Sequence, residues 1–243
     1  MKIMSFSVRN IKEIVRDKVN LCFGLGFPIV LLLLLYVIGI NVPENIFPID
    51  EIAPGIAVFA LSFISLFSAQ IISKDRTTAF MMRLMASPMK SRDYIIGYTL
   101  PLLPISIAQS AVCLAFALIL GLELSANIFL CILVLIPAVF LYISIGLLCG
   151  SIFNDKQVGG ICGALLTNVS AFLSGIWFDL KLVGGYFEKI AYLLPFVHAV
   201  DASKNAINGR YDEILPHLIW VCGYAILIYI LSVFVFMRKA EKQ

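Results

Sequence analysis

The residue types that perform covalent chemistry occur in this sequence, but their spacing matches no catalytic or metal-binding motif. The six cysteines all lie inside apolar runs and form no CxxC pair, so we expect buried thiols and no metal site or disulfide. Ser174-Gly175 is a lone dipeptide without a histidine placed to serve as its base. There is no HExxH zinc motif and no Walker A sequence. We therefore expect no catalytic residue, no metal and no cofactor bound by this chain, and a function in binding or transport.

Polar side chains inside the apolar runs are the remaining candidates for contact with a small molecule. Gln70, Gln109, Asn168 and Ser170 are possible linings of a substrate pathway; the alternative is hydrogen bonding between neighbouring helices. No lysine, arginine, aspartate or glutamate lies near the centre of an apolar run. Because ion-coupled carriers usually need such a group within the membrane, the sequence disfavours a proton- or sodium-driven transporter.

The composition indicates which elements hold these residues. The chain is 61% hydrophobic and 14% charged, with a mean hydropathy of +0.99, whereas a soluble domain carries roughly 25% charged residues. A helix needs about 20 mostly apolar residues to cross a bilayer, and only helices satisfy their backbone there. We predict an all-α integral membrane protein, a single domain over residues 1–243, with six transmembrane helices. The predicted spans are about 21–40, 52–73, 94–120, 127–153, 158–178 and 215–237.

The basic residues predict the orientation. If the N-terminus lies in the cytoplasm, 14 of the 18 lysines and arginines fall on the cytoplasmic side, as the positive-inside rule requires. Six spans then place both termini in the cytoplasm. The net charge of +3 is too small to suggest nucleic-acid binding.

Two flanking segments are predicted to be helical without crossing the membrane. Residues 1–20 repeat apolar side chains on one helix face, which indicates an interfacial amphipathic helix; the alternative is an ordinary basic flank. The stretch 179–213 is predicted to form two short re-entrant helices before the last span, and the alternative is an ordered extracellular loop. The apolar face of the first segment comprises Met4, Val8, Ile11, Val15 and Val19.

The cytoplasmic loop 74–93 combines five basic residues with a cluster of large apolar side chains. Phe80 and Leu84, with Met81 and Met85, would form an apolar stripe on a short helix that ends before Pro88. Such side chains in a cytoplasmic loop require a partner or the membrane to cover them, and methionine adapts to an apolar groove. The alternative is a positively charged loop held only by the membrane surface.

Two segments and the order of the elements resemble the permeases of ABC-2 type ABC exporters. The segments are RLMASPMKSRDYIIGY (83–98) and PFVHAVDASKNAINGRYDE (195–213), and the resemblance covers essentially the whole chain. It implies a multi-pass protein of the bacterial plasma (inner) membrane that exports an amphipathic or hydrophobic substrate, such as a drug, an antimicrobial peptide or a lipid-linked compound.

The same resemblance implies the partners. A separate cytoplasmic ABC ATPase would bind ATP and Mg²⁺, and a second copy or a related permease would complete the pathway. Where the family commonly has a glutamate before the arginine, this chain has Met82, so the contacts of that glutamate are not expected. The alternative function is a secondary transporter or channel that ATP does not drive. The ATPase-coupling residues that the resemblance implies are Asp75, Arg76, Phe80, Met81, Arg83, Leu84, Ser87 and Pro88.

Overall fold

The protein is an elongated bundle of helices in a computed structural model, which describes residues 2–42, 47–78 and 91–240. Within these ranges no strand occurs. The helices are α1 (Lys2–Arg16), α2 (Lys18–Asn41), α3 (Ile49–Thr77), α5 (Ser91–Ile119), α6 (Ala126–Ile152), α7 (Asp155–Val158), the π-helix η1 (Gly159–Leu166), α8 (Thr167–Phe172), α9 (Leu180–Val183), α10 (Gly185–Leu193), α11 (Pro195–Ile207), the 3₁₀ turn η2 (Tyr211–Glu213) and α12 (Ile214–Ala240).

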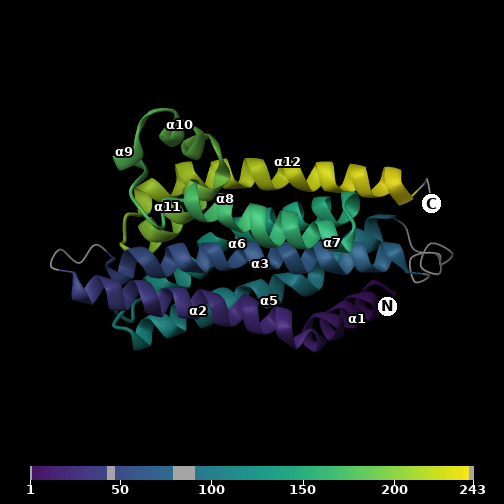
Figure 1. Ribbon diagram of the computed structural model, residues 1–243, viewed down its shortest axis with the longest axis horizontal. Coiled ribbons are helices and arrows are strands. Elements are labelled where there is room, and N and C mark those ends of the chain that lie inside the picture. Colours follow the sequence, from purple (N-terminus) through teal and green to yellow (C-terminus); the bar gives the residue numbers. More distant parts are fainter. Residues whose placement is uncertain (1, 43–46, 79–90, 241–243) are drawn as a thin grey trace.

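Five of these helices form the long axis of the molecule. Helices α2, α3, α5, α6 and α12 are long and apolar enough to cross a membrane, and they coincide with five of the six predicted spans. Figure 1 shows them side by side, with both chain termini at the same end of the bundle. The prediction of an all-helical, membrane-embedded fold is confirmed at this level.

The predicted span at 158–178 differs from its expected form. The helix begins at Asp155, three residues before the predicted beginning, and the side chain of Asn154 caps it. The middle is the π-helix η1, and the hydroxyl of Thr167, the first residue of α8, donates to the Cys162 carbonyl five residues back. The helix ends at Phe172, because the chain turns at Gly175, whose φ of +71° favours glycine. Segments α7, η1 and α8 nevertheless follow one another along the bundle (Figure 1).

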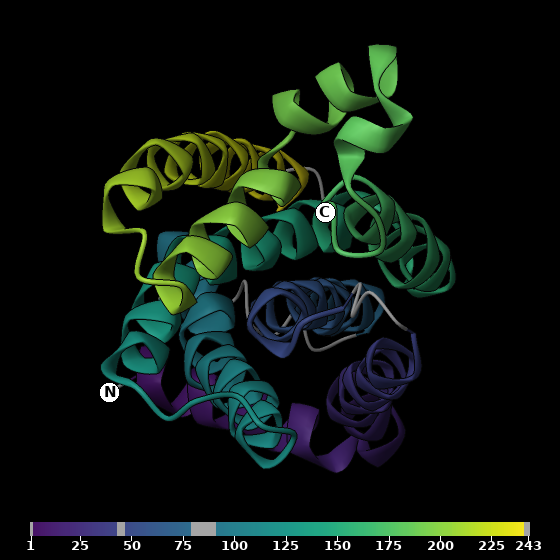
Figure 2. The same cartoon turned by 90° about the vertical axis from the view of Figure 1, so that its left-hand side faces the viewer.

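Helix α3 lies at the centre of the bundle, and Figure 2 shows the other helices around it. In its most apolar stretch 89% of the residues are buried, against 22% in α2 and 17% in α12. Close packing on α6 explains part of this difference: a Cβ at Gly146 would collide with the Ser65 carbonyl, and one at Gly150 with the Ala69 carbonyl. This small-residue spacing allows two membrane helices to approach closely, whereas α2 and α12 leave large apolar surfaces uncovered.

Helix α1 ends at Arg16, so the expected segment 1–20 is shorter than predicted. The physical reason is Asp17, whose side chain accepts the Asn20 backbone N–H and begins α2. Within α1, the apolar stripe remains on the surface, with Met4 64% and Val15 55% exposed. A different face is buried, comprising Phe6, Ser7, Asn10 and Ile14, and α1 packs mainly against α5.

The stretch 179–213 contains two short helices, α10 and α11, flanked by single turns. Helix α11 begins at Pro195, a favourable first helical position, and packs against α3, α6 and α12. Most of its residues are buried. Helix α10 projects outward with α9 at the end of the bundle away from the termini (Figure 1), and its Tyr186 is 85% exposed.

Candidate functional site: a charge network where α3 ends and α5 begins

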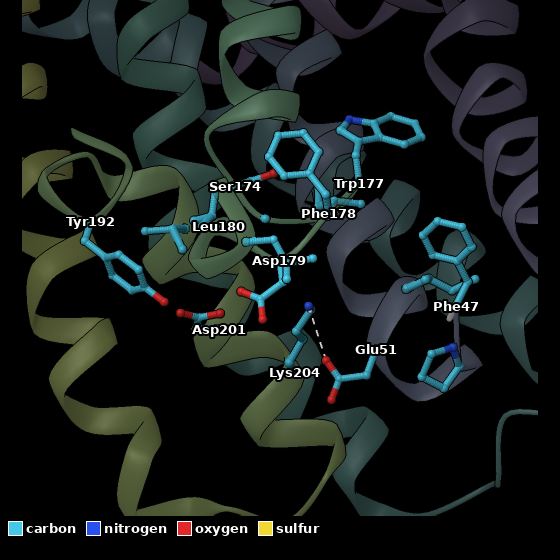
Figure 3. A pocket seen from close by; sticks show the side chains of 16 residues that line it. Phe47, Glu51, Ser174, Trp177, Phe178, Asp179, Leu180, Tyr192, Asp201 and Lys204 are labelled. Atoms are coloured by element: carbon cyan, nitrogen blue, oxygen red, sulfur yellow. Dashed lines mark ion pairs between the residues drawn. The ribbon is translucent and has the colours of Figure 1, made fainter. Parts of the chain in front are cut away.

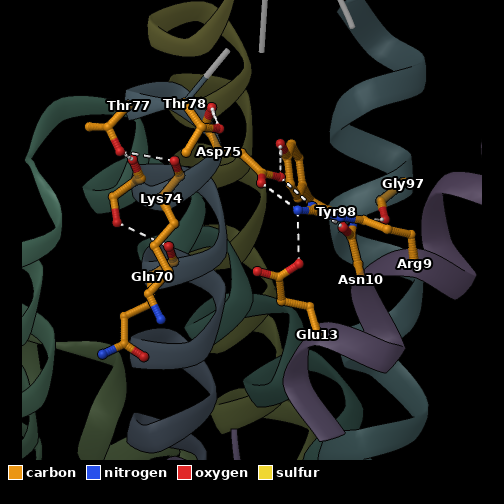
Figure 4. Close-up of polar contacts among 11 residues, drawn as sticks. Arg9, Asn10, Glu13, Gln70, Lys74, Asp75, Thr77, Thr78, Gly97 and Tyr98 are labelled. Atoms are coloured by element: carbon orange, nitrogen blue, oxygen red, sulfur yellow. Dashed lines mark hydrogen bonds and ion pairs between the residues drawn. The ribbon is translucent and has the colours of Figure 1, made fainter. Parts of the chain in front are cut away.

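A buried carboxylate lies in the last turns of α3, directly before the segment 79–90. The side chain of Asp75 is 4% exposed. Its two oxygens accept hydrogen bonds of 2.6 and 2.8 Å from the guanidinium of Arg9. The hydroxyl of Tyr98, on α5, donates to the same carboxylate at 2.9 Å. A charge inside protein needs such paired donors, and Figure 4 shows them arriving from α1 and α5.

Arg9 is held in place by its own helix. Glu13, one turn later, forms an ion pair with the guanidinium at 2.8 Å, and the Asn10 side-chain oxygen accepts a further hydrogen bond at 3.0 Å. Burial alone would lower the pKa of Arg9, but the hydrogen bond to Asp75 and the charges of Asp75 and Glu13 raise it above its ordinary value. Arg9 is therefore a permanent cation that joins α1 to α3.

A second set of contacts fixes α1 on α5. The Asn10 amide donates to the Gly97 carbonyl at 3.0 Å, and the Ser7 hydroxyl donates to the same oxygen at 3.3 Å. The ring of Phe6 lies so close that a Cβ at Gly97 would collide with it. The same ring packs edge-on against Tyr98, with centroids 4.9 Å apart. Helix α1 is thus attached to both helices that flank the segment 79–90.

The other side of the α3 terminus is bonded to the end of α6, which also accepts a bond from α12. Arg76 donates to the Gly150 carbonyl at 2.8 Å, and Lys239 donates to the Ile152 carbonyl at 3.0 Å. Both oxygens belong to the last turn of α6, where unpaired carbonyls and the helix dipole favour cations. The last turn of α3 therefore joins α1 and α5 on one side to α6 on the other, and α12 is bonded to the same end of α6.

These contacts change the interpretation of the predicted coupling residues. Asp75 and Arg76 are occupied by bonds within the chain. Arg9 and Tyr98 were not predicted, because they lie 66 and 23 positions from Asp75 and no local pattern connects them. The other coupling candidates lie outside the described residues: Phe80, Met81, Arg83, Leu84, Ser87 and Pro88.

Three of the four polar span residues bond to other parts of the bundle. The buried Gln109 amide donates to the Gly24 carbonyl of α2 and the Ala60 carbonyl of α3, at 2.7 and 2.9 Å. Ser170 shares a hydrogen bond with the Tyr142 hydroxyl, and Gln70 accepts from the Asn20 amide at 2.8 Å. These bonds correspond to the alternative role, which is contact between helices.

Asn168 is placed differently from these three. It is exposed, and within the described part of the chain its amide bonds only to the Ala164 carbonyl of the adjoining η1, at 2.8 Å. It lines a lateral groove of about 400 Å³ between α2, α3 and α8, hereafter the aromatic groove. The other walls of this groove are mainly aromatic and include Phe23, Phe27, Phe59, Phe63, Phe172 and Trp177.

Comparison with known proteins identifies the family. Within the described ranges, no group of three histidine, cysteine or carboxylate side chains is arranged to hold a metal ion. No curated protein matches the sequence. A family model described as ABC-2 family transporter protein matches residues 41–234, well over half of the chain. This match includes α3, α5, α6 and most of α12, but only the last residue of α2. The chain is therefore a member of the ABC-2 transporter family, whose proteins are membrane subunits of ABC transporters.

Proposed function

We propose that this chain is the permease subunit of an ATP-driven exporter in the plasma membrane of a bacterium. It crosses the membrane six times, with α7, η1 and α8 together forming the fifth crossing in chain order, and keeps both termini in the cytoplasm. A separate ABC ATPase binds ATP and Mg²⁺, and a second copy or a related permease completes the pathway. Family membership and the position of both termini at one end of the bundle support this proposal.

The observation that carries ATP coupling is the bidentate pair between Arg9 and Asp75. It joins α1 to the last turns of α3, immediately before the segment 79–90. A paired, largely buried charge resists separation, so a force applied to that segment is passed on to α1 and to the central helix together. Because α3 packs against α2, α5, α6, α8 and α11, a shift of its end is passed directly to most of the bundle.

The aromatic groove supports an amphipathic or hydrophobic substrate. It opens sideways between membrane helices, and Asn168 offers one amide among aromatic rings. A site with mostly apolar walls and few polar groups suits a molecule that partitions into the bilayer. We assign Asn168 to the substrate pathway.

The test is co-expression of the tagged permease with its ABC ATPase, followed by purification in mild detergent and measurement of ATP hydrolysis. Leu84→Asp is expected to abolish stimulation of the ATPase, because a charge would be buried in the docking interface. Membrane insertion of the variant should be unchanged.

Leu124→Asp is the matched control. Leu124 is 79% exposed in the α5–α6 connection at the opposite end of the bundle, so the same substitution there should leave stimulation intact. Equal stimulation of the ATPase by native permease and the Leu84→Asp variant would contradict the proposed docking site. Substrate transport by the permease without any ATPase would favour a secondary transporter or channel instead.

A further inference from the structure

A second cavity lies at the end of the bundle away from the termini. Its volume is about 580 Å³, within the range of roughly 300–1,000 Å³ typical of small-molecule sites. We call it the outer cavity. It is enclosed by the start of α3, the turn that follows α8, helix α9 and one side of α11. Figure 3 shows its side chains converging from these separate elements.

Aromatic rings form much of the wall of the outer cavity. They are Phe47, Trp177, Phe178 and Tyr192. Aromatic faces carry negative charge density and attract cations, most strongly where water is excluded. Apart from these rings, the apolar wall is formed by aliphatic side chains such as Ile52 and Leu180.

The charged side chains of the outer cavity are mostly acidic, and one of them is already neutralised. The lining includes Glu51, Asp179, Asp201 and Lys204. Glu51 forms ion pairs with Lys204 at 3.2 Å and with Arg210 at 3.7 Å. The one ammonium group in the lining is thereby engaged with a carboxylate (Figure 3).

Neither of the other two carboxylates forms an ion pair with a described residue. Asp179 caps α9 by accepting the Lys181 backbone N–H at 2.9 Å, and forms no ion pair with any described residue. Asp201, half-buried on α11, makes neither a hydrogen bond nor an ion pair to any described residue. Burial raises the pKa of Asp201 above its ordinary value and the charge of Glu51 adds to this, although the charges of His217, Lys204 and Arg210 oppose it. A cation in the cavity would offset the cost of this carboxylate's partial burial.

The outer cavity shares a wall with the aromatic groove. Trp177 lines both spaces, and its ring lies edge-on to Phe59 of the groove, with centroids 6.3 Å apart. A ligand with an apolar part and a charged part would therefore find a surface for each in two spaces that share Trp177.

We infer that the outer cavity binds an organic cation with apolar or aromatic substituents, and that Asp201 is its charge partner. The identification of this cation as the exported cargo rests on the proposed transport function; its binding to the permease does not. The observations that carry the inference are the volume of the cavity, its aromatic wall and the two carboxylates that form no ion pair with a described residue.

The probe is tetraphenylphosphonium, and tetraphenylborate is its control of the same shape and opposite charge. The full-length permease is placed in lipid nanodiscs without an ATPase, and free probe is measured with ion-selective electrodes against empty nanodiscs. We expect saturable binding of the cation and only lipid partitioning of the anion. Asp201→Asn should weaken cation binding about tenfold, since one charge contact in a partly buried site is worth roughly 1.4 kcal/mol, and Asp201→Glu should restore it.

Asp212→Asn is the matched control, because Asp212 is exposed nearby but lies outside the lining. It removes the same charge and should leave affinity unchanged. A second variant avoids the packed interior, because Leu182 is 83% exposed at the cavity edge. Leu182→Lys adds a positive charge there and should weaken cation binding, whereas the neutral Leu182→Gln should not.

Equal saturable binding of both ions would overturn the inference, and so would equal affinities of the Asp201→Asn and Asp212→Asn variants for the cation. Because no ATPase is present, failure here leaves the coupling experiment unaffected. If instead the ATPase-stimulation experiment fails, the cation-binding measurement still tests this inference independently.

Discussion

Removing Arg9 tests whether the charge network holds the α3 terminus in place. Arg9→Ala leaves the Asp75 carboxylate, 4% exposed, with the Tyr98 hydroxyl as its remaining hydrogen-bond partner among the described residues. Loss of one partner from a buried ion pair costs about 3–5 kcal/mol. Because the Arg9 side chain is itself 32% exposed, water can enter the vacated space, and we expect the lower end, about 3 kcal/mol.

The assay is thermal unfolding of the purified permease in detergent, followed by far-ultraviolet circular dichroism. For a chain of this size 1 kcal/mol corresponds to roughly 2–4 °C in Tm, so Arg9→Ala should lower Tm by about 6–12 °C. Glu13→Gln is the control: it removes a more exposed pair, 43% exposed at Glu13, which is worth about 0.3–0.5 kcal/mol, and should lower Tm by about 1–2 °C.

A double variant separates the buried charge from general damage to α1. Arg9→Ala combined with Asp75→Asn removes the unpaired carboxylate, so the double variant should recover part of the Tm lost by Arg9→Ala. If Arg9→Ala melts within 2 °C of the native protein, or if the double variant loses the full sum of the two single effects, the network does not hold the α3 terminus as described.

Three further predictions concern packing, topology and pH. Gly146→Ala should destabilise the bundle by about 1–3 kcal/mol through overpacking, whereas Gly223→Ala, with nothing within 4 Å of its added Cβ, should not lower Tm. In a cysteine-free background, a cysteine at Leu124 should react with an impermeant thiol reagent on intact cells and one at Lys156 should not; labelling of both would refute the topology. Tetraphenylphosphonium affinity should fall as the pH is lowered through the raised pKa of Asp201, because the carboxylate becomes neutral, and an equally steep fall in Asp201→Asn would contradict this assignment.

The sequence alone was sufficient to locate the five long helices and to place an amphipathic helix before them. Both signals are local: a span requires about 20 apolar residues in succession, and amphipathicity requires only a repeat along one helix. The same local rule misplaced the end of the segment predicted at 158–178. Hydropathy continues past Phe172, while the backbone turns at Gly175.

Tertiary structure decided which of these elements is central and which polar groups meet. All spans are apolar, so hydropathy cannot distinguish the central α3 from the exposed α12; close approach through Gly146 and Gly150 does. The pairing of Arg9 with Asp75 and the assembly of the outer cavity from residues 47–204 join positions that are distant in the chain. A buried charge and a cavity depend on which helices pack together, and that information is carried by the whole bundle rather than by any single segment.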